Sequence, residues 1–324
     1  MTLLGFCKNH EHLFIYGAGK RGVSVKNMIG QHGFQVEAYI VSHIDSSQKQ
    51  IESIDILSFE QWKKTYGDLN GGILIAVSDK YVNEITHTLL SAGIKSFFFA
   101  NNETCQEFRR ETDTVKLHDL LNSVEPVSRL FGFDRGTPID RYYMDKFLTE
   151  NAIAMPNPQN TFEVGESIYS EKFYENANHE ILMFDKGMDL TKPETVRQNY
   201  YDVFICTQVF NFIYDVKAAI RGAFSLLRDG GVMLCTVAGN ISQVSRSDME
   251  NYGHFWGFTY LGIQRLVEET FGEQNVKVCP YGNAMAATAF IQGIAVEDLK
   301  EKEKLDLIDP DYAITVGIVA KKRG

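Results

Sequence analysis

The sequence has no excess of basic charge and no pairing pattern among its few cysteines. Lysine and arginine number 32 against 42 aspartate and glutamate residues, for a formal net charge of -10 at pH 7. Nucleic-acid backbones and anionic membranes are bound by clustered basic side chains, so this balance argues against both as the main partner. The five cysteines are odd in number and show no metal-ligand spacing, which predicts a reducing cytoplasm and no metal site.

A hydrophobic run long enough to cross a bilayer is also missing. The longest apolar segment, residues 284–296, is interrupted by Gln292, whereas a spanning helix needs about 20 apolar residues. The first residues show no basic stretch followed by an apolar one, which is the pattern of an export signal. We therefore expect a cytoplasmic protein that is neither exported nor transmembrane.

The sequence does contain two glycine turns, each directly after a short strand-like run. The first turn is Gly17–Gly22 and the second surrounds Gly165. Such turns open strand–helix units in which backbone and helix amides meet a nucleotide. A length of 324 residues fits about two domains of roughly 150 residues each. We predict an α/β protein with tandem domains at 1–105 and 127–324, joined by a charged linker at 106–126.

In the first domain, strand-like runs alternate with helical ones. Strands are expected at residues 13–16, 36–41, 73–77 and 94–99, and helices at 21–31, 58–66 and 82–92. This order predicts right-handed crossovers and a parallel sheet that ends after about four strands. Gly17 would form the tight turn, Gly19 would let a phosphate approach, and Gly22 would let the helix pack closely.

The second strand of this domain does not end in the acidic residue that holds a ribose in dinucleotide sites. It ends at Val41, and Asp45 comes only further along, which disfavours NAD. Ile15–Gly19, Ser58–Glu60 and Ala76–Asp79 resemble the small Rossmann-like domains that precede sugar acetyltransferases and polysaccharide-modifying enzymes. That resemblance implies a nucleotide, nucleotide-sugar or sugar ligand. Alternatively, the glycines only close the turn and the domain serves docking, including homodimer formation.

The second domain repeats the alternation, and here an acidic residue does follow the second strand. Strands are expected at residues 160–164, 180–184, 202–206, 232–237 and 314–320, with a helix at 216–227. Ahead of them, Thr137 and Pro138 are typical of a helix start, with Thr137 as the N-cap. Asp185 comes about 20 residues after Gly165, where a carboxylate accepts both ribose hydroxyls of an adenosine.

This half resembles the class I S-adenosylmethionine-dependent methyltransferases. The stretches that carry the resemblance are Phe162–Gly165, Asp185–Asp189, Tyr201–Val209 and Leu227–Gly231. The resemblance implies a Rossmann-like doubly wound sheet and S-adenosylmethionine as the cofactor. It places the first-motif residues on Glu163 and Gly165, the ribose acid on Asp185, the adenine-side positions on Asp189 and Leu190, and the fourth-strand loop on Thr207 and Gln208.

One departure from the family concerns the glycine-rich loop. The family normally has two or three glycines there, but no glycine follows Gly165 within Glu166–Ser170. A side chain in place of glycine restricts φ and adds bulk next to the cofactor.

Further stretches are similar to a subgroup of bacterial methyltransferases associated with surface-polysaccharide assembly. They are residues 135–148, 241–249, 255–259, 281–283 and 309–312, and the resemblance covers about residues 127–324. It implies a sugar or sugar-derived acceptor. The identity of the acceptor and the methylated atom stay open.

Methyl transfer requires the acceptor, the methyl carbon and the sulfur to be held in line, which suggests where supporting side chains lie. Tyr142, Tyr169 and Glu163 are candidates to stabilise the positive sulfur, because aromatic faces and carboxylates attract cations. His254 is the candidate base for an acceptor hydroxyl, since a neutral imidazole is available near pH 7. The alternative for His254 is a packed or surface histidine.

Arg246 and Trp256 are the candidates for contact with the acceptor. Arginine presents a planar fork of donors that suits a phosphate or carboxylate. Trp256 lies in the family-like stretch that follows His254.

Two other functions fit part of the sequence. Tyr142 and Lys146 have the Tyr-x-x-x-Lys spacing of short-chain dehydrogenases, which would imply an NAD(P)-dependent reductase. The same i, i+4 spacing also simply places two residues on one helical face. The third hypothesis is a catalytically inactive scaffold that binds a nucleotide or sugar.

Overall fold

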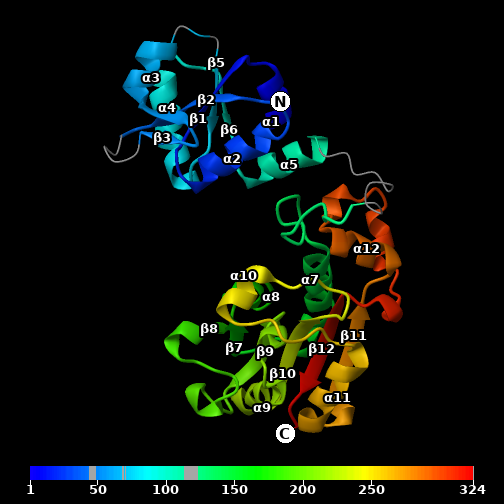
Figure 1. Ribbon diagram of the computed structural model, residues 1–324. Helices are drawn as coiled ribbons and strands as arrows, with labels where there is room; N and C mark the ends of the chain where they lie inside the picture. Colours follow the sequence, from blue (N-terminus) through cyan, green and yellow to red (C-terminus); the bar gives the residue numbers. More distant parts are fainter. Residues whose placement is uncertain (44–48, 68, 70, 113–122, 324) are drawn as a thin grey trace. The chain divides into compact units, whose positions relative to one another are not determined.

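The computed structural model describes residues 1–43, 49–67, 69, 71–112 and 123–323, which divide into two compact units (Figure 1). Unit 1 comprises Met1–Asn122 with Asp134–Gly136, and unit 2 comprises Ser123–Phe133 with Thr137–Gly324. Asp45 and part of the predicted linker lie outside the described residues. Residues 106–112 of that linker belong to helix α5 (Asn102–Thr112), whose Phe108 is fully buried.

Unit 1 is built on a sheet with helices on both faces. Its strands are β1 (His12–Tyr16), β2 (Val36–Val41), β3 (Gln50–Ile51), β4 (Ile54–Ser58), β5 (Gly71–Ile75) and β6 (Phe97–Phe99). Its helices are α1 (Leu3–Lys8), α2 (Lys20–Gly30), α3 (Phe59–Tyr66), α4 (Val82–Ser91) and α5. The strand order in the described residues is β3-β4-β2-β1-β5-β6, and all neighbours are parallel except β3 and β4.

The prediction that this sheet ends after about four strands is wrong. The four predicted strands are present, but β4 pairs in parallel with β2, and β3 adds a short antiparallel edge beyond β4. Neither strand has a long periodic run, since β3 has two residues and β4 has five. Their pairing depends on the neighbouring β2, which local sequence patterns do not report.

Alternation along β1 explains why both faces of this sheet are covered. Leu13 and Ile15 pack into one hydrophobic layer with residues of α1, α2 and α5. Phe14 and Tyr16 pack into the other layer with residues of α3 and α4. A strand that is apolar at every position is typical of a parallel sheet buried on both sides.

Unit 2 is built on a second sheet of mixed direction. Its strands are β7 (Asn160–Val164), β8 (Asn178–Leu182), β9 (Tyr201–Thr207), β10 (Leu227–Ala238), β11 (Val276–Tyr281) and β12 (Thr315–Lys321). Its helices are α7 (Ile139–Asn151), α8 (Ile168–Phe173), α9 (Val216–Leu226), α10 (Arg246–Asn251), α11 (Tyr260–Phe271) and α12 (Ala284–Gln292).

The order of these strands is that of a doubly wound, class I methyltransferase-like sheet. In the described residues it is β11-β12-β10-β9-β7-β8, with β8, β7, β9 and β10 parallel and β12 antiparallel to both neighbours. The predicted fold class, two tandem Rossmann-like domains of which the second is methyltransferase-like, is therefore confirmed.

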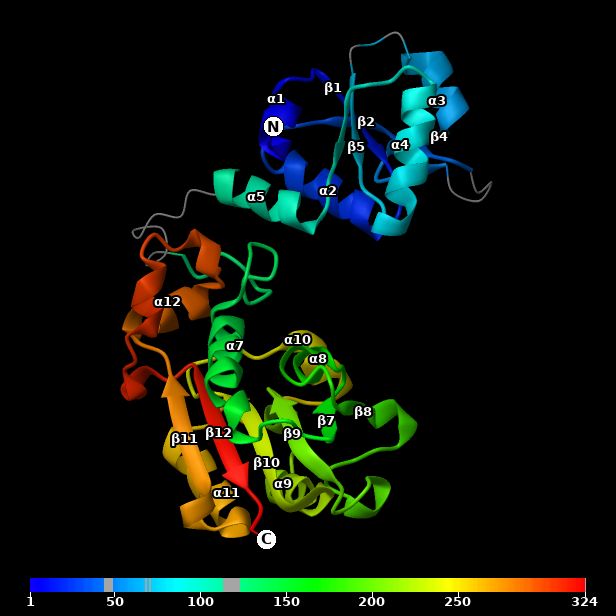
Figure 2. The ribbon, with the colours of Figure 1, turned by 180° about the vertical axis from the view of Figure 1, so that it is seen from behind.

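Helices cover both faces of this sheet, as Figures 1 and 2 show from opposite sides. Val316 and Ile318 of β12 face the core shared with α9 and α11. Between them, Gly317 faces α7, where an added Cβ would lie 2.3 Å from the ring of Phe147. The glycine lets α7 pack directly on the backbone of the sheet.

Two local predictions in unit 2 are corrected by the structure. Pro138, not Thr137, is the N-cap residue of α7, and the Thr137 hydroxyl donates to Glu297 over 2.7 Å. The second strand, predicted to run to residue 184, ends at Leu182, and Asp185 lies in a 3-10 turn at Phe184–Lys186. The partner of Thr137 lies 160 residues away, so capping rules based on neighbours did not anticipate it.

The described residues also bear on cysteine chemistry, metals and membranes. All five cysteines are free, and burial raises the pKa of the Cys7 thiol to about 12. No group of three or more metal-ligating side chains is found among the described residues. In the same ranges, every helix is too short or too polar to cross a membrane.

Candidate functional site

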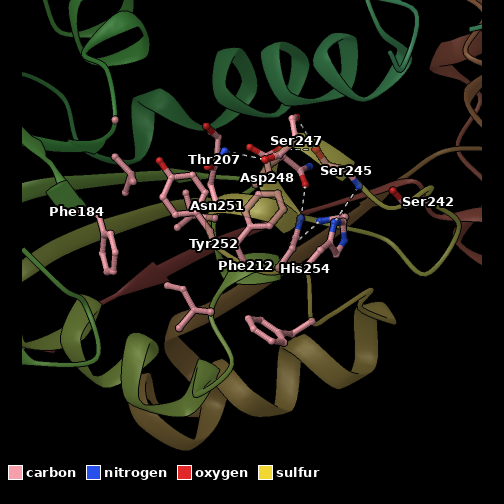
Figure 3. A pocket seen from close by; sticks show the side chains of 18 of the residues that line it. Phe184, Thr207, Phe212, Ser242, Ser245, Ser247, Asp248, Asn251, Tyr252 and His254 are labelled. Atoms are coloured by element: carbon pink, nitrogen blue, oxygen red, sulfur yellow. Dashed lines mark hydrogen bonds between the residues drawn. The ribbon is translucent and has the colours of Figure 1, made fainter. Parts of the chain in front are cut away.

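A cavity of about 1490 Å³ lies in unit 2 at the carboxyl ends of the central strands. Its wall includes the residues that follow β7, β8 and β9. After β7 the chain adds β8 on one side and then β9 on the other, so the direction in which strands are added reverses at this point. Doubly wound sheets bind ligands at such a reversal, because the loops on its two sides diverge. The wall also includes residues around α10, which are Ser242, Ser245–Asp248, Glu250–Tyr252, His254 and Phe255. Figure 3 shows side chains of that segment, with Phe212 next to His254.

The cavity brings together eight of the residues predicted for a site in this half. They are Gly165, Asp185, Asp189, Leu190, Thr207, Gln208, Arg246 and His254. The wall does not include the other four, which are Tyr142, Glu163, Tyr169 and Trp256.

Glu163 and Gly165 build the turn after β7 in different ways. The Glu163 carboxylate accepts the backbone N–H groups of Tyr169 at 3.2 Å and Ser170 at 2.7 Å, one on each oxygen. Burial raises the pKa of Glu163, and these hydrogen bonds oppose the rise. Gly165 has a φ of +83°, and a Cβ there would meet nothing within 4 Å. Glu163 therefore stabilises the start of α8, while the backbone at Gly165 is open to the cavity.

The two aspartates beyond β8 differ in whether they have partners. Asp189 Oδ1 accepts both the backbone N–H of Thr191 at 2.9 Å and its hydroxyl at 2.7 Å, and Lys192 Nζ lies 3.3 Å from Oδ2. Burial acts to raise the pKa of Asp189, but these contacts lower it overall. Asp185 is exposed on the wall, and no donor in the described part of the chain bonds its carboxylate. Asp185 is thus the carboxylate available to a ligand.

Gln208, directly after β9, presents a buried donor that lacks a partner. Its φ is +56°, its Oε1 accepts the Nδ2 group of Asn211 at 3.0 Å, and its Nε2 is unpaired in the described structure. Asn211 is itself buried, and its Oδ1 accepts the backbone N–H of Ala238 at 3.1 Å. An unpaired buried donor costs about 1–3 kcal/mol, so this amide is suited to an acceptor atom on a ligand.

His254 is half-buried against Phe212, with the ring centroids 5.1 Å apart. Its Nδ1 accepts the backbone N–H of Ser245 at 3.2 Å. A neutral ring that accepts at Nδ1 carries its proton at Nε2. Burial lowers the pKa of His254, and the nearby carboxylate of Asp248 opposes that shift. The ring is therefore neutral at pH 7, with Nε2 as a donor.

Arg246 and Trp256, the residues predicted to contact the acceptor, have different surroundings. Arg246 is the first residue of α10, is exposed on the cavity wall, and makes no ion pair with the described residues. The Trp256 indole N–H donates to the carbonyl of Ile213 at 3.0 Å, and its ring stacks on Tyr214. Trp256 thus lies next to the cavity rather than on its wall.

Tyr142 and Tyr169 point to other partners. The Tyr142 hydroxyl and the Lys146 amino group each donate to Asp306 Oδ1 at 2.7 Å. A reductase would require this tyrosine and lysine at a nicotinamide site, but both are held by one carboxylate away from the cavity wall. Burial raises the pKa of Tyr169, and the charge of nearby Arg141 opposes the rise.

Two wall residues that sequence reasoning did not assign to the site come from the start of α7. Arg141 has a buried Nε without a partner among the described residues, and its guanidinium lies 5.7 Å from the ring centre of Phe133. Burial raises the pKa of the neighbouring Asp140 carboxyl group, and the positive charge of Arg141 opposes this rise. Both residues lie in the family-like stretch 135–148, but sequence reasoning assigned neither of them a role in the site.

The charge of the cavity wall is predominantly negative. Six carboxyl groups line it, those of Asp140, Asp185, Asp189, Asp215, Asp248 and Glu250. Three guanidinium groups line it, those of Arg129, Arg141 and Arg246. This balance favours a ligand that carries positive charge over part of its length.

In the predicted nucleotide turn of unit 1, two glycines are packed against other backbone atoms and one has free space where a side chain would be. Gly17 has a φ of +118°, and a Cβ there would lie 2.6 Å from the carbonyl oxygen of Ala76. A Cβ on Gly22 would lie 1.9 Å from the carbonyl oxygen of Gly17, whereas one on Gly19 would meet nothing within 4 Å. The packing of the chain therefore accounts for Gly17 and Gly22, and only Gly19 leaves space for a ligand.

Comparison with known proteins adds likenesses to solved structures. No protein-family model and no curated protein matches the sequence. A SAM-dependent methyltransferase from Archaeoglobus fulgidus is 12% identical over 56% of this chain and 94% of that chain, with a TM-score of 0.39. The N-methyltransferase NodS from Bradyrhizobium japonicum WM9, solved with S-adenosyl-L-homocysteine, is 12% identical over 58% and 89%, with a TM-score of 0.36.

A third similar structure is an S-adenosylmethionine-dependent methyltransferase from Mesorhizobium loti. It is 10% identical over 57% of this chain and 98% of that chain, with a TM-score of 0.37. At these scores the fold assignment rests on the strand order of unit 2, not on the likeness.

Proposed function

We propose that unit 2 is an S-adenosylmethionine-dependent methyltransferase. The observation that supports this most is the Asp185 carboxylate, which lies on the cavity wall after the second strand and has no partner among the described residues. A carboxylate in that place accepts both hydroxyls of a ribose through charge-assisted hydrogen bonds. On the neighbouring strand, the open backbone at Gly165 leaves room for the rest of the cofactor.

The size and charge of the cavity also fit this cofactor. Typical ligand cavities measure about 300–1,000 Å³, and the cavity of about 1490 Å³ has room for a second ligand beside it. Its predominantly negative wall suits the positive sulfur of S-adenosylmethionine. The unpaired Nε2 of Gln208 supplies a donor for an oxygen or ring nitrogen. Thr207, Asp189 and Leu190 complete the proposed cofactor wall.

When bound, S-adenosylmethionine supplies a methyl group that is already activated on a positive sulfur. The protein therefore has to hold the acceptor in line with that methyl group and exclude water. We propose a sugar or sugar-derived acceptor, methylated in the biosynthesis of a surface polysaccharide. The exposed guanidinium of Arg246 is available to an acidic group on it.

His254 is proposed to contact the acceptor. With Nδ1 accepting from Ser245, its Nε2–H can donate to an acceptor oxygen and orient it. Action as a base requires Nε2 to be free of its proton, which means a change of tautomer and loss of the bond from Ser245. A role in orientation needs no such change.

Calorimetric titration with S-adenosylhomocysteine tests the proposal. Asp185→Ala is expected to weaken binding by about 1 to 3 kcal/mol, which is about 5- to 150-fold in Kd. Asp311→Ala, which removes an exposed carboxylate outside the cavity wall, is the matched control and should bind like wild type. Equal affinity of all three proteins would remove Asp185 from the site. Binding of NADH without binding of S-adenosylhomocysteine would support the reductase hypothesis instead.

A further inference from the structure

We infer that Tyr214, Phe255 and Trp256 form an aromatic platform that stacks against a sugar unit of the acceptor beside the cavity. Tyr214 and Phe255 lie on the cavity wall, and Trp256 continues the same surface just beyond it. The assignment of this sugar to the acceptor rests on the proposed function. The inference adds that the acceptor extends over more than one sugar unit.

The three rings are exposed and contact one another. Their exposed fractions are 73% for Tyr214, 47% for Phe255 and 37% for Trp256. Tyr214 stacks on Trp256 at an interplanar angle of 26°, with the centroids 6.3 Å apart. The ring of Phe255 meets Tyr214 edge to face at 5.5 Å. A contiguous exposed apolar surface at the rim of a cavity is typical of a binding surface.

The platform is held in position before any ligand arrives. The carbonyl oxygen of Asn211 accepts the backbone N–H groups of Phe255 at 2.8 Å and Trp256 at 3.2 Å. The Trp256 indole N–H donates to Ile213, which fixes the plane of the ring. Gly253 lets the Phe255 ring lie against the backbone, since a Cβ there would be 2.4 Å from that ring. Rings that are already ordered lose little conformational freedom when a ligand binds.

The chemistry around the platform favours a sugar over other ligands with flat faces. Nucleic acid also stacks on aromatic rings, but its phosphates would be repelled by a chain of net charge -10 and by the carboxylates of this cavity. A sugar ring combines an apolar C–H face for the platform with hydroxyl groups that donate to carboxylates. Glu250, on the same cavity wall, is exposed and supplies such an acceptor.

Continuity with the cavity links the platform to the acceptor. One sugar unit in the cavity, near Arg246 and His254, would leave the next unit of the same chain at the rim, over Tyr214 and Phe255. The platform would therefore raise the affinity for an oligosaccharide and leave the affinity for a monosaccharide nearly unchanged.

Direct binding of neutral saccharides, measured by calorimetry without cofactor, tests this inference. The probes are cellohexaose, maltohexaose and N-acetylchitohexaose, each compared with its monosaccharide. We expect at least one hexasaccharide to bind at least about tenfold more tightly than its monosaccharide. Tyr214→Ala should weaken that binding by about fivefold or more. The matched control, Tyr312→Ala, changes a tyrosine that is 42% exposed and lies outside the cavity wall, and should bind like wild type.

Fluorescence gives a second readout, whose main signal comes from wild type and therefore does not depend on the folding of a variant. The chain has two tryptophans, of which Trp62 is buried in unit 1 and Trp256 belongs to the platform. Saccharide binding should therefore shift the emission of wild type, and this shift should be absent in Trp256→Phe. Failure of all three hexasaccharides to bind at up to about 10 mM, or equal affinity of Tyr214→Ala and wild type, would overturn the inference.

Sedimentation analysis tests whether the platform is instead a surface through which copies of the chain associate. If wild type dimerises with increasing concentration and Tyr214→Ala does not, the platform is an interface between copies of the chain and the inference is wrong. Because no probe here involves S-adenosylhomocysteine, failure of the methyltransferase proposal and failure of the platform give different results.

Discussion

The Nδ1 atom of His254 accepts a hydrogen bond from the backbone N–H of Ser245 at 3.2 Å. This contact connects the loop before α10 to the loop after it, across the cavity wall. It also sets the tautomer of the ring, because a nitrogen that accepts an N–H cannot itself carry a proton. Protonation of His254 would therefore break the bond, in addition to charging a half-buried ring.

The titration of His254 gives the first prediction. Burial lowers its pKa, so we expect its ring to titrate below the usual value of about 6.5. His12 is the internal comparison, because its hydrogen bond to Glu37 raises its pKa. Proton NMR titration, assigned with His254→Gln and His12→Gln, should show His254 titrating at a lower pH than His12. The reverse order would contradict the burial of the His254 ring as the dominant influence on its pKa.

Stability should follow the same titration. Because the pKa of His254 is lower in the folded than in the unfolded chain, the unfolded chain binds more protons in this range. The contribution of neutral His254 is present above about pH 6.5 and is lost as the pH falls through that value toward the folded pKa. Thermal unfolding of wild type should therefore lose more stability between about pH 7 and 5 than that of His254→Gln, and equal losses would argue against the shift.

Asn211 gives a prediction about packing under the site. Asn211→Ala would leave the Ala238 N–H and the Gln208 Oε1 atom without their partner, inside the protein. We expect a loss of about 2–3 kcal/mol in the free energy of unfolding, from two groups that are buried unpaired. Asn275→Ala removes only one bond, from Nδ2 to the carbonyl of Phe271, and should cost about 1 kcal/mol or less. Denaturant titration measures both, and a cost for Asn211→Ala no larger than for Asn275→Ala would refute the prediction.

Gly165 and Gly187 form a matched pair for the cofactor turn. Their φ values are +83° and +82°, and a Cβ at either position meets nothing within 4 Å. Alanine at each should therefore cost a similar strain of about 1–2 kcal/mol in stability. Only Gly165 lies on the cavity wall, so only Gly165→Ala should weaken binding of S-adenosylhomocysteine in calorimetry. Equal affinity of the two variants would mean that the ligand does not approach the turn.

The turn of unit 1 gives a contrast between two glycines in one motif. Gly22→Ala places a Cβ 1.9 Å from the carbonyl oxygen of Gly17, so it should destabilise unit 1 by about 3 kcal/mol or prevent its folding. Gly19→Ala meets no neighbour at a φ of -87°, and should cost less than about 1 kcal/mol as a poorer N-cap residue. Circular dichroism melts of the two variants measure this difference, and similar melting temperatures would contradict it.

Local hydrophobic patterns and turn residues in the sequence were sufficient to predict most strands and helices of both units. β1, β2, β5, β7 and β9 are short apolar or β-rich runs between turn residues, and each lies within about two residues of its predicted place. β10 begins at Leu227, five residues before its predicted start. The glycine turns could be predicted equally well from the sequence, because a positive φ at Gly17 or Gly165 disfavours most other residue types. These features depend on neighbours in sequence, which is why they could be predicted.

Features that depend on distant partners could not be predicted. The hydroxyl of Tyr142 finds its partner Asp306 at a separation of 164 residues, which takes it away from the cavity. Asn211 reaches Ala238 across 27 residues and supports the site without any motif of its own. Arg141 enters the cavity wall, whereas Tyr142, the next residue on the helix, does not.

The order of residues alone was enough to establish two α/β units, the places of their glycine turns and the acidic residue beyond the second strand of unit 2. Backbone stereochemistry and apolar periodicity are local, so they are expressed in the sequence itself. Which carboxylates remain free, and which helix face turns toward the cavity, was decided only when distant segments packed. Asp185 is left for a ligand while Glu163 is occupied by the start of α8, because hydrogen bonds form between groups that folding brings together.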